Sequence, residues 1–346
     1  MRAAGALLEA GANANTGFFD RDHQPTPAFE SVLYGAAGVA HHAELTRLLL
    51  AHGADPTDGE VLYHSPEGYD NEVLRLLLDT GRLDAEALAM MLLRKIDWHD
   101  HDGVKLLLER GADPNRSWGT GFTGLHHALR RDNWIETIAL LLDHGGDPAR
   151  REHGHTAVER AAWCGRGDVL ALLEARGIDV APDDVHRLVA ACARGDEAEV
   201  RAAAAPEHVQ HVVSHGAELL ARFALTDNEA GAARLLDLGV PVDARWGGDG
   251  YWGVPAGSTA LHVAAWLLRP EVVRLLLARG ADVGARDANG RTPLALAARA
   301  SVDSYWRERR SVDLIEALLD AGAAPSEVTL PTGDAGIDEV LRGHGR

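Results

Sequence analysis

The sequence predicts an all-α solenoid of about nine to ten helix-turn-helix units with short hairpin-like fingers. A Gly-Ala-Asp-like tripeptide closes a leucine-rich stretch seven times, and the copies at Gly111, Gly145 and Gly177 lie about 33 residues apart. Glycine suits each closure because a helix commonly ends with a left-handed residue. The seven tripeptides begin at Gly11, Gly53, Gly111, Gly145, Gly177, Gly280 and Gly322.

Each unit is too small to bury its own apolar face, so we expect one continuous repeat domain over residues 1–346. A half repeat opens the chain, two degenerate units lie between Gly177 and Gly239, and a closing helix is expected near 334–343. The predicted units lie near 1–15, 31–58, 60–83, 84–116, 123–150, 154–181, 183–213, 216–245, 257–288 and 290–325.

The clearest copy runs from Gly257 to Asp287 and contains TALHVAA from Thr259; TGLHHAL from Thr123 is a second close match. These motifs resemble the ankyrin repeat family, in a bacterial-type form with divergent repeats and long aromatic finger loops. The resemblance implies that His126 and His262 bond backbone and threonine groups and so lock neighbouring repeats together.

Composition narrows the classes of partner. The formal net charge of −18, from 52 acidic and 34 basic side chains, disfavours nucleic acid and would attract a basic partner. Cys164 and Cys192 are the only cysteines, so the sequence predicts a reducing, cytoplasmic location without a disulfide framework. The sequence shows no signal-peptide pattern and no long apolar run, so we expect no membrane association.

Four insertions are too long for ordinary fingers and are rich in aromatic residues, which favours function over disorder. They are Thr16–Pro27, Asn115–Phe122, Arg245–Ala256 and Ser301–Arg310, the last of which carries Tyr305 and Trp306.

The ankyrin resemblance implies that the residue after the signature histidine and the one after the Ala-Ala pair face a binding groove. Tyrosine, tryptophan and arginine anchor protein interfaces, so the leading prediction is a cytoplasmic protein–protein interaction module. An alternative is that Trp163 and Trp266 only fill space between repeats. The predicted groove residues are Tyr63, His64, Glu67, Trp118, Phe122, His127, Arg130, Arg160, Trp163, Trp246, Tyr251, Trp252 and Trp266.

A second hypothesis is an unusual enzyme or small-molecule binder, with an acid–base or metal site walled by the finger aromatics. Its candidate groups are His64, His127, Glu159 and Arg160, because imidazole and carboxylate can exchange protons. The run from Asp97 to Asp102 could also hold a metal, although a solvated polar turn is the better interpretation. Cys164 is expected to be a buried structural thiol. No metal site is assigned, and no cofactor is predicted because nucleotide-binding motifs are missing.

Overall fold

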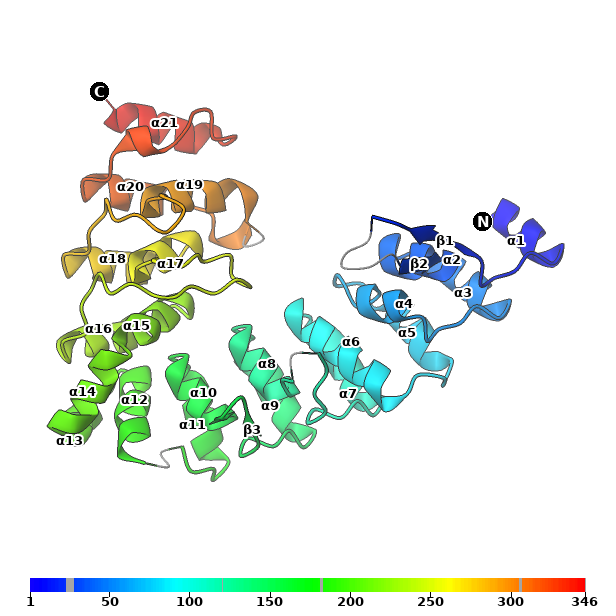
Figure 1. Ribbon diagram of the computed structural model, residues 1–346, viewed down its shortest axis with the longest axis horizontal. Coiled ribbons are helices and arrows are strands. Elements are labelled where there is room, and N and C mark those ends of the chain that lie inside the picture. The colour runs from blue at the N-terminus through cyan, green and yellow to red at the C-terminus, as the bar shows by residue number, and fades with distance from the viewer. Residues whose placement is uncertain (23–27, 120, 181–182, 305–306, 346) are drawn as a thin grey trace. The chain divides into compact units, whose positions relative to one another are not determined.

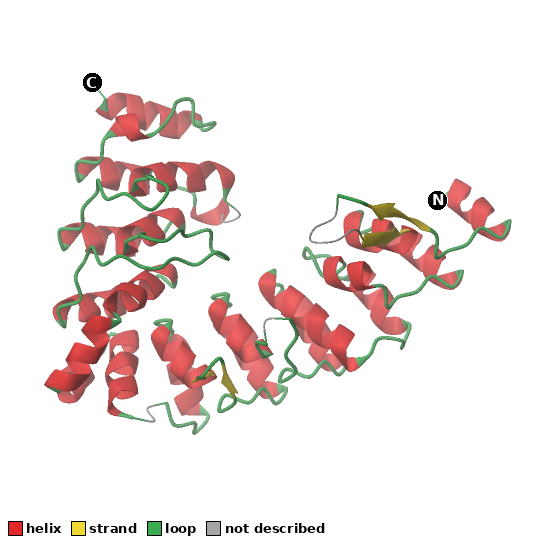
Figure 2. Ribbon diagram, in the orientation of Figure 1, coloured by secondary structure: helices red, strands yellow, loops and turns green. Residues whose placement is uncertain are grey.

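The computed structural model describes residues 1–22, 28–119, 121–180, 183–304 and 307–345. Contacts divide the chain into two compact units, which we call unit 1 (Met1–Ala157) and unit 2 (Val158–Arg346). In the described part of the chain helices dominate, and strands form two short hairpins (Figure 2). This confirms the predicted all-α class. Tyr305 and Trp306, two of the predicted insertion aromatics, lie outside the described residues.

Unit 1 contains a single opening helix, a β-hairpin and then successive helix pairs (Figure 1). Its elements are α1 (Arg2–Glu9), β1 (Gly17–Asp20), β2 (Ala28–Ser31), α2 (Val32–Tyr34), the π-helix η1 (Gly35–Val39), α3 (Ala43–Ala51), α4 (Gly59–His64), α5 (Glu72–Asp79), α6 (Ala85–Asp97), α7 (His101–Glu109), α8 (Gly124–Arg130), α9 (Ile135–Asp143), β3 (Arg151–Glu152) and β4 (His155–Thr156).

Unit 2 continues with helix pairs, and Figure 1 shows α15/α16, α17/α18 and α19/α20 as successive layers that end at α21. Its elements are α10 (Ala157–Trp163), which begins at the boundary, α11 (Gly167–Ala175), α12 (Asp184–Arg194), α13 (Glu197–Ala203), α14 (Pro206–Ser214), α15 (Gly216–Leu225), α16 (Glu229–Asp237), α17 (Ala260–Trp266), α18 (Pro270–Ala278), α19 (Pro293–Asp303), η2 (Arg307–Arg309), α20 (Asp313–Asp320), η3 (Pro325–Glu327) and α21 (Ala335–His344).

The signature histidines lock neighbouring repeats as the resemblance implies. Thr123 Oγ1 donates to His126 Nδ1 at 2.7 Å, and His126 Nε2 donates to the carbonyl of His155 at 3.0 Å. His262 repeats the arrangement with Thr259 at 2.9 Å and the Arg291 carbonyl at 3.1 Å. Both imidazoles are fully buried with satisfied nitrogens, so their role is structural.

Within a repeat, a residue with positive φ turns the chain from the first helix into the second. Glycine takes this position in some repeats, but His41, His99 and Asp132 adopt φ values of 45°, 53° and 52°. The next helix then begins two or three residues later. These turns set the common register by which equivalent residues of different repeats can be compared.

The degenerate region of unit 2 differs from the predicted two-helix units. The segment 183–213 contains α12, α13 and an additional helix, α14, begun by Pro206. Thr226, which follows α15 in the next repeat, donates a hydrogen bond from its hydroxyl to the carbonyl of Cys164 at 2.9 Å, 62 residues earlier in the chain. The repeat before the 183–213 segment and the repeat after it are therefore in direct contact, although this segment separates them in the sequence.

Apolar stripes of the helix pairs form the cores of both units. Leu74, Leu77 and Leu141 in unit 1 and Leu276 in unit 2 are fully buried. In the part of the chain that the structure describes, each helix is too short or too polar to cross a lipid bilayer.

Candidate functional site: an aromatic and ionic row in unit 1

The first helices of three consecutive repeats, α4, α6 and α8, pack in sequence within unit 1 and bring polar and aromatic side chains together. We call this set the row. The row consists of Tyr34, Tyr63, His64, Glu67, Arg94, Asp97, Trp118 and His127, with Glu60 and Arg131 at its edges.

The first part of the row is aromatic. The His64 ring lies 5.4 Å from Tyr34 and 4.9 Å from Tyr63, and Tyr63 lies 6.1 Å from Trp118 of the finger. Gly38 in the π-helix makes room for this packing, because a Cβ there would lie 2.7 Å from the Tyr34 ring. The four rings are partly exposed. They can therefore contact a partner while their neighbours restrict their motion.

Arg94 connects the aromatic part to the ionic part. Its guanidinium carbon lies 4.2 Å from the centroid of Tyr63, and its Nε donates to the Tyr63 carbonyl at 3.3 Å. The guanidinium also pairs with Glu67 and, at 3.1 Å, with Asp97. A planar guanidinium can make these contacts at once because it presents several donors in fixed directions.

Two carboxylates surround His64 in the same part of the row. Glu67 Oε1 lies 3.2 Å from His64 Nδ1, and Glu60 Oε2 lies 3.4 Å from His64 Nε2. All three side chains are about a quarter exposed, with values between 25% and 29%. The His64 ring thus lies between two carboxylates, each within 3.4 Å of one of its nitrogens.

Asp97 anchors the far end of the row. His127 Nε2 donates to Asp97 Oδ1 at 2.8 Å, and Arg131 Nε donates to the same oxygen at 2.6 Å. Burial opposes ionisation of Asp97, but the His127 hydrogen bond and the positive charge of Arg131 outweigh it and lower the pKa of Asp97 to about 2. Burial also lowers the pKa of His127, despite Asp97, so the pair is a carboxylate with a neutral imidazole at neutral pH.

A finger flanks the row through Trp118 and Phe122, which form an isolated antiparallel bridge. Arg130 lies over the Phe122 ring at 5.2 Å, and the His153 ring lies 4.6 Å from it. Phe122 is only 7% exposed, so it fixes the position of Arg130 and His153 and offers little surface of its own.

In unit 2 the predicted groove aromatics separate into two kinds. Trp163, Trp266 and Tyr251 keep exposed surface, and the Tyr251 value is 41%. Trp246 and Trp252 are only 7% and 9% exposed, so their side chains pack inside the repeats. Their burial disfavours the expected direct contact with a partner.

Specific contacts hold these tryptophans in unit 2. Trp266 Nε1 donates to the Trp252 carbonyl at 2.6 Å, which fastens the 245–256 finger to α17. Trp163 packs edge-on against His215 at 5.4 Å, and Arg222 lies over Trp246 at 5.5 Å. The finger aromatics therefore stabilise the repeats that they join.

The four acid–base candidates divide between the two units. His64 and His127 belong to unit 1, whereas Glu159 and Arg160 lie on α10 in unit 2. His127 and Glu159 are 5% and 4% exposed, so a substrate would reach neither side chain without rearrangement. Cys164 is buried and free, as expected for a structural thiol.

The run from Asp97 to Asp102 is not the solvated turn that the sequence favours. Asp97 belongs to the row, and Asp100 is 5% exposed and bonds the fully buried Lys95 at 2.8 Å. Asn71 donates to the same Asp100 oxygen at 2.9 Å. These carboxylates are thus occupied by protein groups, and the described residues contain no group of three or more side chains placed to hold a metal ion.

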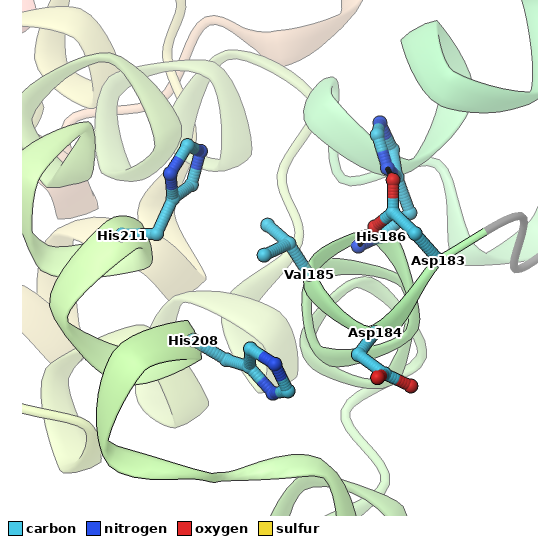
Figure 3. A pocket seen from close by; sticks show the side chains of 6 residues that line it. All are labelled: Asp183, Asp184, Val185, His186, His208 and His211. Atoms are coloured by element: carbon cyan, nitrogen blue, oxygen red, sulfur yellow. Dashed lines mark hydrogen bonds and ion pairs between the residues drawn. The ribbon is translucent and has the colours of Figure 1, made fainter.

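Sequence reasoning does not identify a shallow pocket of about 380 Å³ between α12 and α14 (Figure 3). His208 and His211 on α14 face Val185 of α12, and Asp183 bonds His186 Nδ1 at 2.7 Å. Burial and the neighbouring His215 and His186 lower the pKa of His211. The pocket is open and its histidines bind their own neighbours, so it offers weaker support for a binding site than the row does.

The predicted groove residues do not include Tyr34, Arg94 or Asp97. The position of Arg94 could have been found by aligning the repeats on their left-handed turns. His99 and Asp132 occupy the same turn in adjacent repeats, and the residues five positions earlier are Arg94 and His127. Arg94 is therefore equivalent to a predicted groove residue. The degenerate signature of its own repeat conceals this register.

Comparison with known proteins agrees with the geometry of the repeats. Residues 90–184 match the family described as ankyrin repeats (3 copies), and residues 235–297 match ankyrin repeats (many copies). Protein PhlB of Serratia liquefaciens is 34% identical over 38% of this chain and 56% of its own length. Ankyrin repeat domain-containing protein 9 of Mus musculus is 54% identical over 13% of this chain and 14% of its own.

A third relative, probable E3 ubiquitin-protein ligase XBOS33 of Oryza sativa subsp. japonica, is 30% identical over 53% of this chain and 30% of its own length. The chain thus spans less than two thirds of each of these relatives. Both matched segments contain a signature histidine locked to the following repeat. The chain is an ankyrin-repeat protein, and ankyrin repeats are generally protein–protein interaction modules.

Proposed function

We propose that this chain binds a protein partner and that the row of unit 1 is a principal contact surface. The main support is the continuity of the row. Its partly exposed rings contact one another in succession: Tyr34, His64, Tyr63 and Trp118. Aromatic side chains that are already fixed lose little entropy on binding, and they contribute a large apolar area.

The ionic part of the row supports specific recognition. Arg94 and Asp97 are largely buried, with side-chain exposures of 16% and 14%, whereas Glu67 is 25% exposed. A partner that covers the aromatic rings would also cover these charges and strengthen their interactions. In unit 2, Trp163, Trp266 and Arg160 also keep part of their surface exposed and offer further contacts of the same chemistry.

Charge and cysteine usage complete the proposal. The net charge of −18 favours a basic partner through long-range attraction. Both cysteines are buried and free, and burial raises the pKa of Cys192 to about 12, so its thiol stays protonated. Unpaired thiols support a reducing compartment such as the cytoplasm.

The test begins with capture of proteins from native lysate, followed by affinity measurements with the purified partner. Trp118→Ala should weaken binding on the order of tenfold or more, because an interface tryptophan contributes strongly. Trp134→Ala is the matched control, since Trp134 is 57% exposed and lies outside the row. Equal losses in the two variants, or none in either, would contradict the role of the row.

A further inference from the structure

The β1–β2 hairpin of unit 1 exposes three of the five phenylalanines in the chain. Phe18, Phe19 and Phe29 are 62%, 64% and 44% exposed. The other two, Phe122 and Phe223, are 7% and 0% exposed. The protein thus buries phenylalanine elsewhere and presents it on this hairpin, as is typical of an interaction surface.

The strand register gives the hairpin two distinct faces. Phe19 is paired with Phe29, and their ring centroids lie 6.1 Å apart, so one face is apolar. Gly17 lies beneath this pair, because a Cβ there would be 2.7 Å from the Phe29 ring. Phe18 is paired with Glu30, so the opposite face combines an aromatic ring with a carboxylate, and Asp20 follows on the same side.

The acidic face continues into the first two repeats. Ser31, the last residue of β2, caps α2 by accepting from the Tyr34 amide at 3.0 Å, so Glu30 comes just before the cap of the helix that carries Tyr34. The Tyr34 ring lies 5.4 Å from His64, which in turn lies 3.4 Å from Glu60.

The electrostatic surroundings of Tyr34 agree with this arrangement. Burial raises the pKa of Tyr34, and the negative charges of Glu30, Glu60, Glu67 and Asp20 raise it further. Arg94 offsets part of this charge by pairing with Glu67. Glu30, Asp20 and Glu60 therefore leave negative charge around Tyr34, on the face of the hairpin that carries Phe18.

We propose that the hairpin surface, with Phe18, Asp20, Glu30 and Glu60 on its acidic face and the Phe19–Phe29 pair on its apolar face, docks an extended basic segment of a protein partner whose alternating side chains reach both faces. Carboxylates attract arginine or lysine, and the aromatic faces accept both the cationic head and the apolar stem of these side chains. The net charge of −18 adds attraction over longer distances. This inference rests on the proposed function and adds the class of partner and its point of attachment.

The probe is a fluorescent peptide that alternates arginine with leucine, titrated into the full-length chain at low and physiological salt. We expect Glu30→Gln/Glu60→Gln to weaken binding about three- to tenfold, because each exposed ion pair contributes modestly. Phe19→Ser/Phe29→Ser should weaken it on the order of tenfold through lost apolar contact. The weakening by the glutamine variant should shrink as salt rises.

The matched control is Glu109→Gln/Glu136→Gln, which removes the same charge from exposed positions on α7 and α9. The control should bind the peptide like the wild type. The inference is overturned if this control weakens binding as much as Glu30→Gln/Glu60→Gln, or if a peptide with glutamate in place of arginine binds equally well. Circular dichroism of every variant verifies that the helices are retained.

Trp118→Ala separates this inference from the proposed function. It should leave peptide binding unchanged, since Trp118 packs against Tyr63 and is outside the hairpin surface. If the hairpin variants bind the peptide normally while Trp118→Ala still loses the captured partner, the hairpin inference fails and the proposed function stands. If the hairpin variants lose the peptide but Trp118→Ala keeps the partner, the row is rejected and the hairpin is retained.

Discussion

The guanidinium of Arg94 lies 4.2 Å from the centre of the Tyr63 ring and donates to the carbonyl of the same residue. Arg94 lies on α6 and Tyr63 on α4, so this contact joins the first helices of two adjacent repeats. Because Arg94 also pairs with Glu67 and Asp97, one side chain connects the aromatic and ionic parts of the row.

Replacing Arg94 by lysine should show how much this geometry contributes. One ammonium cannot reach Tyr63, Glu67 and Asp97 at once, so we expect Arg94→Lys to lower the free energy of unfolding by about 1–2 kcal/mol. Urea unfolding measures the change. Arg110→Lys is the control, because the Arg110–Asp79 pair is 40% and 60% exposed and should change stability by less than about 0.5 kcal/mol. Equal effects would mean that Arg94 acts only as a positive charge.

The Asp97–His127 pair predicts a loss of stability in acid. The folded pKa of Asp97, about 2, lies below its ordinary value near 3.8, so its stabilisation is present above about pH 4 and is lost as the pH falls towards 2. The shift corresponds to about 2 kcal/mol. The pKa of His127 is also lowered, so its neutral form favours folding and stability begins to fall below about pH 6.5.

Asp97→Asn tests this assignment because it cannot ionise. The variant should be less stable than the wild type by about 2 kcal/mol near pH 7, and the difference should narrow near pH 2–3. Urea titrations at a series of pH values provide the measurement. A difference that stays constant across this range would show that the carboxylate charge is not what stabilises the row.

Substitutions at two equivalent left-handed turns should change the free energy of unfolding in opposite directions. His41 has a φ of 45°, so His41→Gly should raise the free energy of unfolding by about 1 kcal/mol through relief of strain. Gly195 has a φ of 71°, and a Cβ there would lie 2.7 Å from that of Ala230. Gly195→Ala should therefore cost about 1–2 kcal/mol. Thermal unfolding compares the two; destabilisation by His41→Gly would contradict the strain argument.

Buried charges test how the two units unfold. Leu141 and Leu276 are fully buried in units 1 and 2, and aspartate at either position should cost on the order of 4 kcal/mol because its charge has no partner. We expect each variant to lower the melting transition of its own unit first, since repeat arrays unfold locally. Calorimetry should resolve the shifted transition. A wild-type profile in either variant would refute the assignment of that leucine to the core.

Periodicity was sufficient to predict the repeat architecture because each repeat encodes its own local structure. Thr259 and His262 supply a cap and a lock within four residues, and Gly280 ends the second helix. Periodicity failed between Gly177 and Gly239, where α14 adds a third helix to one unit and Thr226 reaches back to Cys164. Contacts over that separation depend on how helices pack, and no local motif records them.

The candidate site was only partly predictable for a related reason. Tyr63, His64, Glu67 and His127 follow from the repeat register, but Arg94 and Asp97 lie in a repeat without the signature. Trp246 and Trp252 look like interface residues in sequence, yet the tertiary structure buries them against their own repeats. The sequence by itself determined the fold class and the family, because turns and capping residues act over a few positions. Only the tertiary structure decided which aromatic and charged side chains meet, because exposure and ion pairing arise between helices far apart in the chain.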